Sequence, residues 1–218
     1  MVRYRGPRLK IIKRFGDLPG LTRKVVLKKQ NAQGKEITDQ KTSKASAYKI
    51  RLNEKQKLRY NYGITESQLL RYVREARRKK GLTGFLLMQL LEMRLDNIIF
   101  RLGLAPTIPA ARQIVNHGHV LINKKRVNIP SFQCRPNDSI SFSTKPKAIA
   151  LIKSNLNQGE NATSSNNVLN SHLEFDQKLL TGKILNLVKR KDLRFKINDM
   201  LVIEYLSLIH ISEPTRPY

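Results

Sequence analysis

The sequence predicts an α+β fold with most of its helices in the first half of the chain. Between residues 46 and 117 the apolar residues recur every three or four positions, as in helices that bury one face. From His119 the period changes to two, and short alternating runs at 119–122 and 138–143 indicate strands. Helices followed by short strands in one compact stretch are typical of an α+β unit.

The 218-residue chain carries a net charge of +26, from 42 Lys and Arg against 16 Asp and Glu. This charge opposes compaction unless a polyanion neutralises it, so the expected partner is nucleic acid, an anionic membrane or an acidic protein. One cysteine, Cys134, excludes an internal disulfide and a zinc ribbon. No apolar run reaches the roughly 18 residues of a bilayer span, and the N-terminus resembles neither a secretory signal nor a transit peptide.

The positive charge is concentrated at the front of the chain. Residues 1–90 carry a net +18 and residues 91–153 a net +7, whereas residues 154–182 carry a net −2. Residues 1–45 show no sustained period, so we expect an extended basic arm with little core of its own. Such an arm is either a disordered solubilising tail or a segment that orders against a phosphate backbone, and the scarcity of acids favours the second.

Three helices are expected within residues 46–91. Good helix formers end near Gly63, a suitable C-cap, and Thr65 then offers an N-cap for a helix over 66–80. Leucines from Leu86 to Leu91 predict a third helix with its apolar face in the core. The end of the helix over 66–80 holds more cations than its dipole needs, which indicates a phosphate-facing surface: Arg74, Arg77, Arg78, Lys79 and Lys80.

Residues 92–153 contain the two helices and short strands of the predicted α+β unit. In the helix over 92–103 one apolar stripe opposes a polar face made of Arg94, Asn97 and Arg101. Thr107 is the expected N-cap of the next helix, which leaves four side chains away from its core face: Arg112, Gln113, Asn116 and His117. A strand at 119–122, a turn at Asn123–Arg126 and a strand at 138–143 complete the unit.

The composition of the chain after residue 153 changes twice. Residues 154–182 are poor in apolar residues and rich in Asn and Ser, which predicts a linker or surface excursion. Residues 183–205 are apolar again and are expected to end in a strand over 200–205. Residues 206–218, LSLIHISEPTRPY, fit no surrounding element, and this off-pattern tail is left out of the expected fold.

The run RLDNIIFRLGLAPTIPAARQIVNHGHVLINKKRVNIPSF at 94–132 resembles the RNA-binding module named after the fourth protein of the small ribosomal subunit. The flanking segments resemble that ribosomal protein family itself, in the same order along the chain. They are RYRGPRLK at 3–10, IRLNEKQKLRYNYGITESQLLRYVREA at 50–76, LLMQLLEMRLDN at 86–97 and INDMLVIEY at 197–205. The segments FGDLPGLT and TIPAARQIVNHGHVLIN are most similar in sequence to the chloroplast-encoded members of this family.

The resemblance implies a mainly helical domain, made discontinuous by an inserted RNA-binding module. Residues 46–91 and 183–205 would form that domain, and residues 92–153 the insert. The implied function is that of a non-catalytic, primary rRNA-binding protein that nucleates small-subunit assembly near the side where mRNA enters. Its implied partners are small-subunit rRNA, neighbouring proteins such as protein five, and mRNA, in the chloroplast or alternatively the bacterial cytoplasm. No cofactor, metal, membrane or small-molecule substrate is expected.

The expected RNA-binding residues follow from the charge pattern and from the module's motif. The arm and the helix over 66–80 supply Arg3, Arg5, Arg8, Lys10, Lys13, Arg14, Arg74, Arg77 and Arg78. The module supplies Arg94, Asn97, Arg101, Thr107, Arg112, Gln113, Asn116, His117, Asn123, Lys124, Lys125 and Arg126. Asp96 has the wrong charge for phosphate and is expected to orient its helix. On this basis, Arg112→Glu is predicted to weaken RNA binding much more than folding.

The turn departs from the family pattern, because many members have Asn-Gly there. In this chain Lys124 follows Asn123, which leaves the turn type open while it adds charge.

Two other functions remain open from the sequence. An enzyme could use the same module to deliver a catalytic domain to RNA, as pseudouridine synthases and some tRNA synthetases do. The sequence offers no Gly-rich phosphate loop and no HxxH or CxxC pair for it, and His117 and His119 indicate a rim rather than a metal site. A membrane-surface binder would need apolar anchors opposite its basic face, whereas the helix over 66–80 needs its apolar side for packing.

Overall fold

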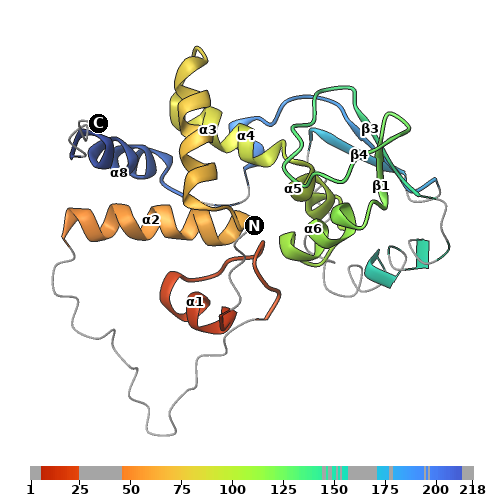
Figure 1. Ribbon diagram of the computed structural model, residues 1–218, viewed down its shortest axis with the longest axis horizontal. Helices are drawn as coiled ribbons and strands as arrows, with labels where there is room; N and C mark the ends of the chain where they lie inside the picture. The colour runs from red at the N-terminus through yellow and green to blue at the C-terminus, as the bar shows by residue number, and fades with distance from the viewer. Residues whose placement is uncertain are drawn as a thin grey trace, which may run out of the picture.

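The computed structural model describes residues 6–24, 46–143, 171–176, 179–193, 195 and 197–212, together with residues 146, 149, 150, 152 and 154–156. Figure 1 shows a helical part, with α1 to α4 and α8, beside a smaller part in which α5 and α6 pack against a sheet. We call the smaller part the module. The predicted α+β class is confirmed.

Local capping signals define the helices of the helical part, which are α2 (Ala47–Tyr62), α3 (Glu66–Arg78) and α4 (Thr83–Glu92). Helix α2 ends at Gly63, whose φ of 59° is left-handed, as the sequence predicts. Thr65 and Gln68 form a capping box at the start of α3. Their apolar faces meet in a core around Leu58, Leu69 and Leu87.

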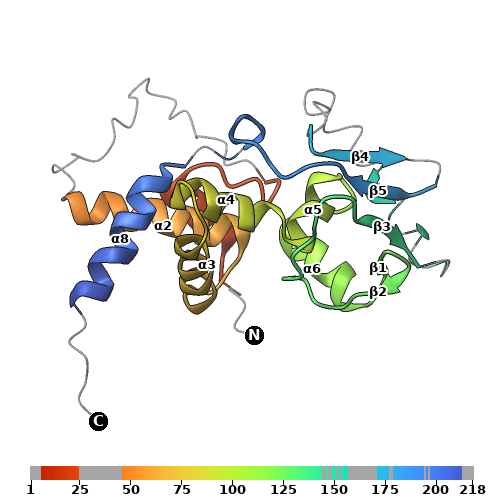
Figure 2. The same cartoon turned by 90° about the horizontal axis from the view of Figure 1, so that it is seen from above.

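The chain returns to this core through α8 (Asp199–Ser212), which packs against α2 and α4 (Figure 2). The strand expected over 200–205 is therefore wrong. The apolar run reads locally as a strand, but helical spacing places Val202, Tyr205 and Leu206 on one buried face. Burial against the other helices outweighs the local strand propensity of residues 200–205, so this run forms a helix. Because Leu206 is in the core and α8 continues to Ser212, the off-pattern tail begins inside this helix.

Residues 6–24 correct the expectation of an extended arm, because residues 8–15 form helix α1 (Arg8–Phe15). Ile11, Leu18 and Leu21 are buried in a small cluster below α2. The following loop is fixed at Gly20, whose N–H donates to Asn61 Oδ1 at 3.0 Å and whose carbonyl accepts from Ile108 N at 2.9 Å. The arm's residues 1–5 and 25–45 lie outside the described residues.

The module packs α5 (Leu95–Arg101) and α6 (Ile108–Asn116) against five antiparallel strands in the order β2-β1-β3-β5-β4. The strands are β1 (Val120–Ile122), β2 (Lys125–Arg126), β3 (Ser139–Phe142), β4 (Leu173–Asp176) and β5 (Thr181–Ile184). Strand β4 and the first half of β5 lie in the stretch expected to be a linker, 154–182. That expectation is wrong for these strands, because sheet pairing and burial of Leu173 opposite Ile184 order a segment with little apolar content.

The docking of residues 6–24 is testable at Gly20. A Cβ there would lie 2.5 Å from the carbonyl oxygen of Asn61 and 2.8 Å from Ile108 Cδ1, so Gly20→Ala forces backbone apart. We expect a loss of about 1–3 kcal/mol in the free energy of unfolding, and faster tryptic cleavage at Lys13 and Arg14. The control is the exposed Asp17→Ala. Equal cleavage rates in Gly20→Ala and the parent would contradict the docked arrangement.

Candidate nucleic-acid interface

Exposed cations occupy two helices of the helical part. On α1 the buried Ile11 and Ile12 face α2, which leaves Arg8, Lys10, Lys13 and Arg14 exposed to solvent. On α3 the buried face consists of Leu69, Val73 and Ala76. Its exposed cations are the predicted Arg74, Arg77 and Arg78 together with Arg71, and the exposed Lys79 and Lys80 directly follow the helix. The predicted Arg3 and Arg5 lie outside the described residues.

The module presents a second exposed set at the end of α6 and in the β1–β2 turn. Gln113, Asn116 and His117 are exposed, and so are Asn123, Lys124, Lys125 and Arg126. Asn123 and Lys124 have φ values of 49° and 66°, so the turn has the type I′ geometry that favours glycine. Its type is thus resolved, with a lysine held in a left-handed conformation at the tip.

Three predicted module residues in or near this set bond within the protein, and one of them is Arg126, whose Nη2 donates to the carbonyl of His117 at 3.4 Å. Thr107 Oγ1 accepts the N–H of Ala110 as the N-cap of α6. Asn123 donates to Asp138 Oδ1 at 2.9 Å and accepts from Ser139 N at 3.0 Å, which fastens the turn to β3. The side chains of Lys124 and Lys125 are exposed and form no such hydrogen bond with the described residues. They are therefore stronger candidates for phosphate contact than Thr107 and Asn123.

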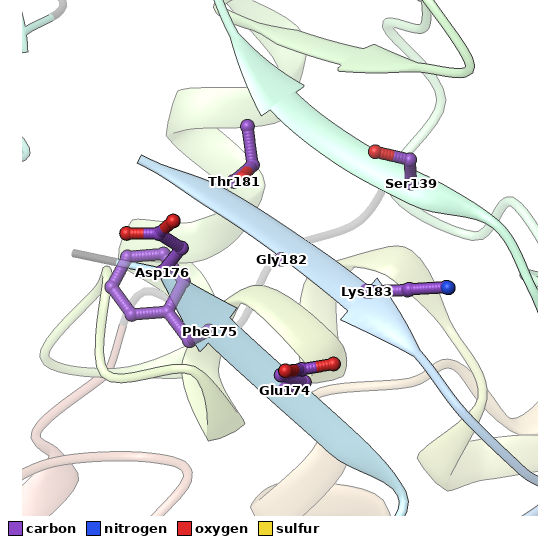
Figure 3. Close-up of a pocket in the computed structure, with 7 residues that line it drawn as sticks. All are labelled: Ser139, Glu174, Phe175, Asp176, Thr181, Gly182 and Lys183. Carbon is purple, nitrogen blue, oxygen red and sulfur yellow. The ribbon is translucent and has the colours of Figure 1, made fainter. Parts of the chain in front are cut away.

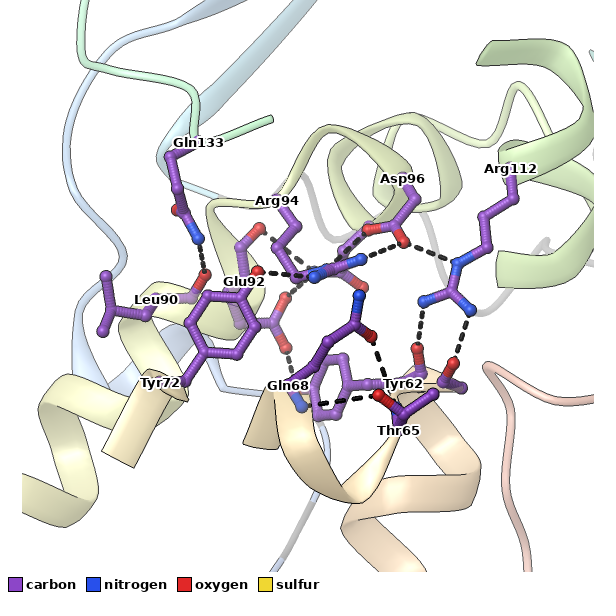
Figure 4. A network of polar contacts seen from close by, with 12 residues as sticks. Tyr62, Thr65, Gln68, Tyr72, Leu90, Glu92, Arg94, Asp96, Arg112 and Gln133 are labelled. Carbon is purple, nitrogen blue, oxygen red and sulfur yellow. Dashed lines mark hydrogen bonds and ion pairs between the residues drawn. The ribbon is translucent and has the colours of Figure 1, made fainter. Parts of the chain in front are cut away.

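Four predicted RNA contacts are instead part of a buried polar network between the two parts, and Figure 4 shows two of them, Arg94 and Arg112. Arg94 is 1% exposed and donates twice to Asp96, at 3.0 and 2.7 Å. Asp96 also accepts from Arg112 Nε at 2.8 Å. The phosphate-contact assignments of Arg94, Asn97, Arg101 and Arg112 are corrected, because these side chains point into the protein and are already bonded there.

Glu92 is the second acid of the network. It accepts from Tyr62 Oη and Asn97 Nδ2, and it forms an ion pair with Arg101 at 2.6 Å. Burial alone raises the pKa of Glu92, but the charge of Arg101 and these hydrogen bonds outweigh burial and lower the pKa. Burial, followed by the charge of Glu92, raises the pKa of Tyr62 well above its usual value, so the phenol remains a donor.

The helix expected over 92–103 is wrong at its start, because α4 ends at Glu92, α5 begins at Leu95, and Arg94 between them is extended and pairs with Gln133. The expected polar face of Arg94, Asn97 and Arg101 lies inside the protein. That face meets α2 and α3 rather than solvent, since Arg94 also donates to Tyr72 Oη at 2.6 Å. One signal was available in the sequence. Glu92 and Asp96 are two acids beside the three arginines of this region, in a chain with only 16 acids. Such a local balance of charge favours internal ion pairs over phosphate contacts.

A hollow of about 650 Å³ lies on β3, β4 and β5. Figure 3 shows Glu174 and Asp176 along β4, with Lys183 on the neighbouring strand. These exposed side chains form no nucleophile-and-base arrangement. Among the described residues, no three His, Cys, Asp or Glu side chains are grouped to hold a metal ion. None of the described helices is both long and apolar enough to cross a bilayer.

Two sets of exposed cations on helices and a turn, attached to a small α+β module, define a nucleic-acid-binding protein. The family model for the ribosomal protein S4/S9 N-terminal domain matches residues 3–92, and that for the S4 domain matches residues 93–140. The chain is 54% identical over 207 residues to small ribosomal subunit protein uS4c of Chaetosphaeridium globosum, covering 95% of this chain and 98% of the relative.

Two further relatives have the same extent. Protein uS4 of Thermosynechococcus vestitus is 53% identical, with 95% of this chain and 98% of the relative covered. Protein uS4c of Cyanophora paradoxa is 52% identical, with 95% and 100% covered. The chain belongs to the uS4 family of small ribosomal subunit proteins.

The buried network predicts a pH-dependent effect of Glu92→Gln. The lowered pKa of Glu92 means that its ion pair stabilises the fold above the unfolded pKa of about 4.3, and that this stability is lost as the pH falls through the folded pKa. We expect Glu92→Gln to lower the free energy of unfolding by about 3 kcal/mol at pH 7, and by less at pH 3.5. Urea unfolding at both pH values measures this. The exposed Glu174→Gln is the control, and an equal loss at both pH values would contradict the prediction.

The left-handed Lys124 predicts opposite effects on stability and binding. Lys124→Gly relieves a conformation that costs a side-chain-bearing residue about 1 kcal/mol, so thermal stability should rise. RNA affinity should fall, with the slope of log K against log salt reduced by about 0.7–0.9. Lys124→Gln separates the two effects, since it removes the charge and keeps the strain. Parent-like RNA binding by both variants would exclude Lys124 from the interface.

Proposed function

We propose that this protein is a structural component of the small ribosomal subunit that binds rRNA without catalysis. The observation that carries the proposal is the pair of exposed cation sets on well-formed elements, one on α1 and α3 and the other on the β1–β2 turn and the end of α6. Membership of the uS4 family supports it.

Affinity in this proposal comes mainly from Lys and Arg contacts to phosphate, since the exposed sets are dominated by those residues. Cations held on helices and a turn are suited to the shape of folded RNA, where duplex geometry and backbone position are read rather than a base sequence. Gln113, Asn116 and His117 supply neutral donors and acceptors beside the module's cations.

The finer role rests on the resemblance to the ribosomal protein family. We infer that the protein nucleates assembly by fixing a junction of rRNA helices, and that it lies beside protein five and near the point where mRNA enters. The compartment we infer is the chloroplast, since the relatives include uS4c proteins as well as cyanobacterial uS4 proteins. Co-sedimentation of the native protein with plastid small subunits at physiological salt tests this placement. Absence of the protein from those subunits at physiological salt would contradict it.

The rRNA-binding proposal predicts a steep salt dependence that depends on particular cations. In filter binding to an rRNA junction fragment, replacing Arg74, Arg77 and Arg78 together by Gln should lower the slope of log K against log salt by about 2. The charge-matched control replaces the exposed Lys183, Lys189 and Lys191 by Gln, and should change the slope much less. A flat salt response of the parent, or equal effects of the two triple variants, would reject the proposed interface.

A further inference from the structure

Arg112 connects three segments through one guanidinium group. Its Nε donates to Asp96 at the start of α5, and its two terminal nitrogens donate to the carbonyls of Tyr62, at 2.8 Å, and Gly63 (Figure 4). Those carbonyls end α2, where the helix leaves them without intrahelical donors. Since Arg112 lies on α6, this side chain fastens the module to the C-terminal end of α2.

Asp96 holds Arg112 in place from the module side. The carboxylate is 1% exposed and receives Arg94 as well as Arg112, so both of its oxygens are bonded. Arg94 in turn donates to Tyr72 Oη on α3. The cluster of Asp96, Arg94 and Arg112 thus contacts α2 and α3 of the helical part, and we call it the clamp.

Few apolar side chains are shared between the two parts, compared with the number that each part buries in its own core. The core of the module and the core of the helical part are separate clusters, and they share the partly buried Phe100 and Leu193. Ile108 of α6 is the module residue that is buried in the helical core. Directional hydrogen bonds therefore contribute strongly to the angle at which the module meets α2 and α3, and the clamp acts there together with the Arg101–Glu92 ion pair and the Ile108 N–H bond to Gly20.

We propose that Asp96 and Arg112 are positioning residues for RNA binding, which hold the two exposed cation sets at the angle that lets both bind one RNA at the same time. This inference rests on the proposed rRNA-binding function. Two linked sites bind far more tightly than either alone, provided that the linkage keeps both in reach of the ligand. A fixed angle also removes the entropy that a loose pair would lose on binding.

The proposal and a direct phosphate contact by Arg112 make opposite predictions for Asp96→Asn. If Arg112 binds phosphate, removal of a neighbouring negative charge raises the local positive potential and strengthens RNA binding. If Asp96 and Arg112 act as a clamp, Asp96→Asn weakens RNA binding, although the net charge of the protein becomes more positive. The sign of the change in affinity separates the two cases.

The experiment compares the parent, Asp96→Asn, Arg112→Lys and the exposed control Asp17→Asn in filter binding to the rRNA junction fragment over a salt series. Circular dichroism sets a temperature at which all four are folded. We expect Asp96→Asn and Arg112→Lys to bind about tenfold more weakly with the salt slope of the parent, since lysine cannot reach all three acceptors. Asp17→Asn should bind as tightly as the parent or more tightly. Parent-like or tighter binding by Asp96→Asn would overturn the proposal.

A measurement without RNA keeps the clamp testable apart from the proposed function. Spin labels at Glu75→Cys on α3 and Ser139→Cys on β3, in a Cys134→Ala background, report the distance between the two parts by pulsed electron paramagnetic resonance. We expect one narrow distance distribution in the labelled parent and a broader one with Arg112→Lys. An unchanged distribution would overturn the clamp, whereas a flat salt response of the parent would reject rRNA binding itself.

Discussion

The structure depends on how five charged side chains share a buried space between two cores. Asp96 and Glu92 are each at most 2% exposed, and they are bonded to Arg94, Arg112 and Arg101. Burying a charge costs several kcal/mol unless partners replace its hydration. In this protein each carboxylate accepts from at least two donors, so the hydrogen bonds and ion pairs that α2, α5 and α6 bring together offset the desolvation.

Because Glu92 and Asp96 are buried, their negative charges do not balance the cations on the protein surface. With two of only 16 acids committed to the interior, the cations on α1, α3 and the β1–β2 turn have few opposite charges around them. The helices that carry them are ordered by apolar faces on the opposite side, at Ile11 on α1 and Val73 on α3. A strongly positive surface is thus displayed on helices that pack against the rest of the protein through their opposite, apolar faces.

Much of the local structure was predictable from short sequence signals. Gly63 and Thr65 mark the boundary between α2 and α3, and Thr107 starts α6, because a cap depends on residues within one turn of it. The change of period at residue 119 likewise located β1. The exposure of Arg77, Lys124 and Arg126 also agrees with the sequence analysis, which placed each of them away from a core face.

The sequence by itself determined the helices of residues 46–117, the first strands and the excess of positive charge. Tertiary structure alone decided that Arg94 and Arg112 face inward, that residues 200–205 form part of a helix and that β4 joins the sheet. Each of these outcomes depends on partners far along the chain: Tyr62 and Tyr72 for the arginines, α2 and α4 for α8, and β5 for β4. Local periodicity shows which side chains share a face, but only the assembled core determines whether that face meets water or protein.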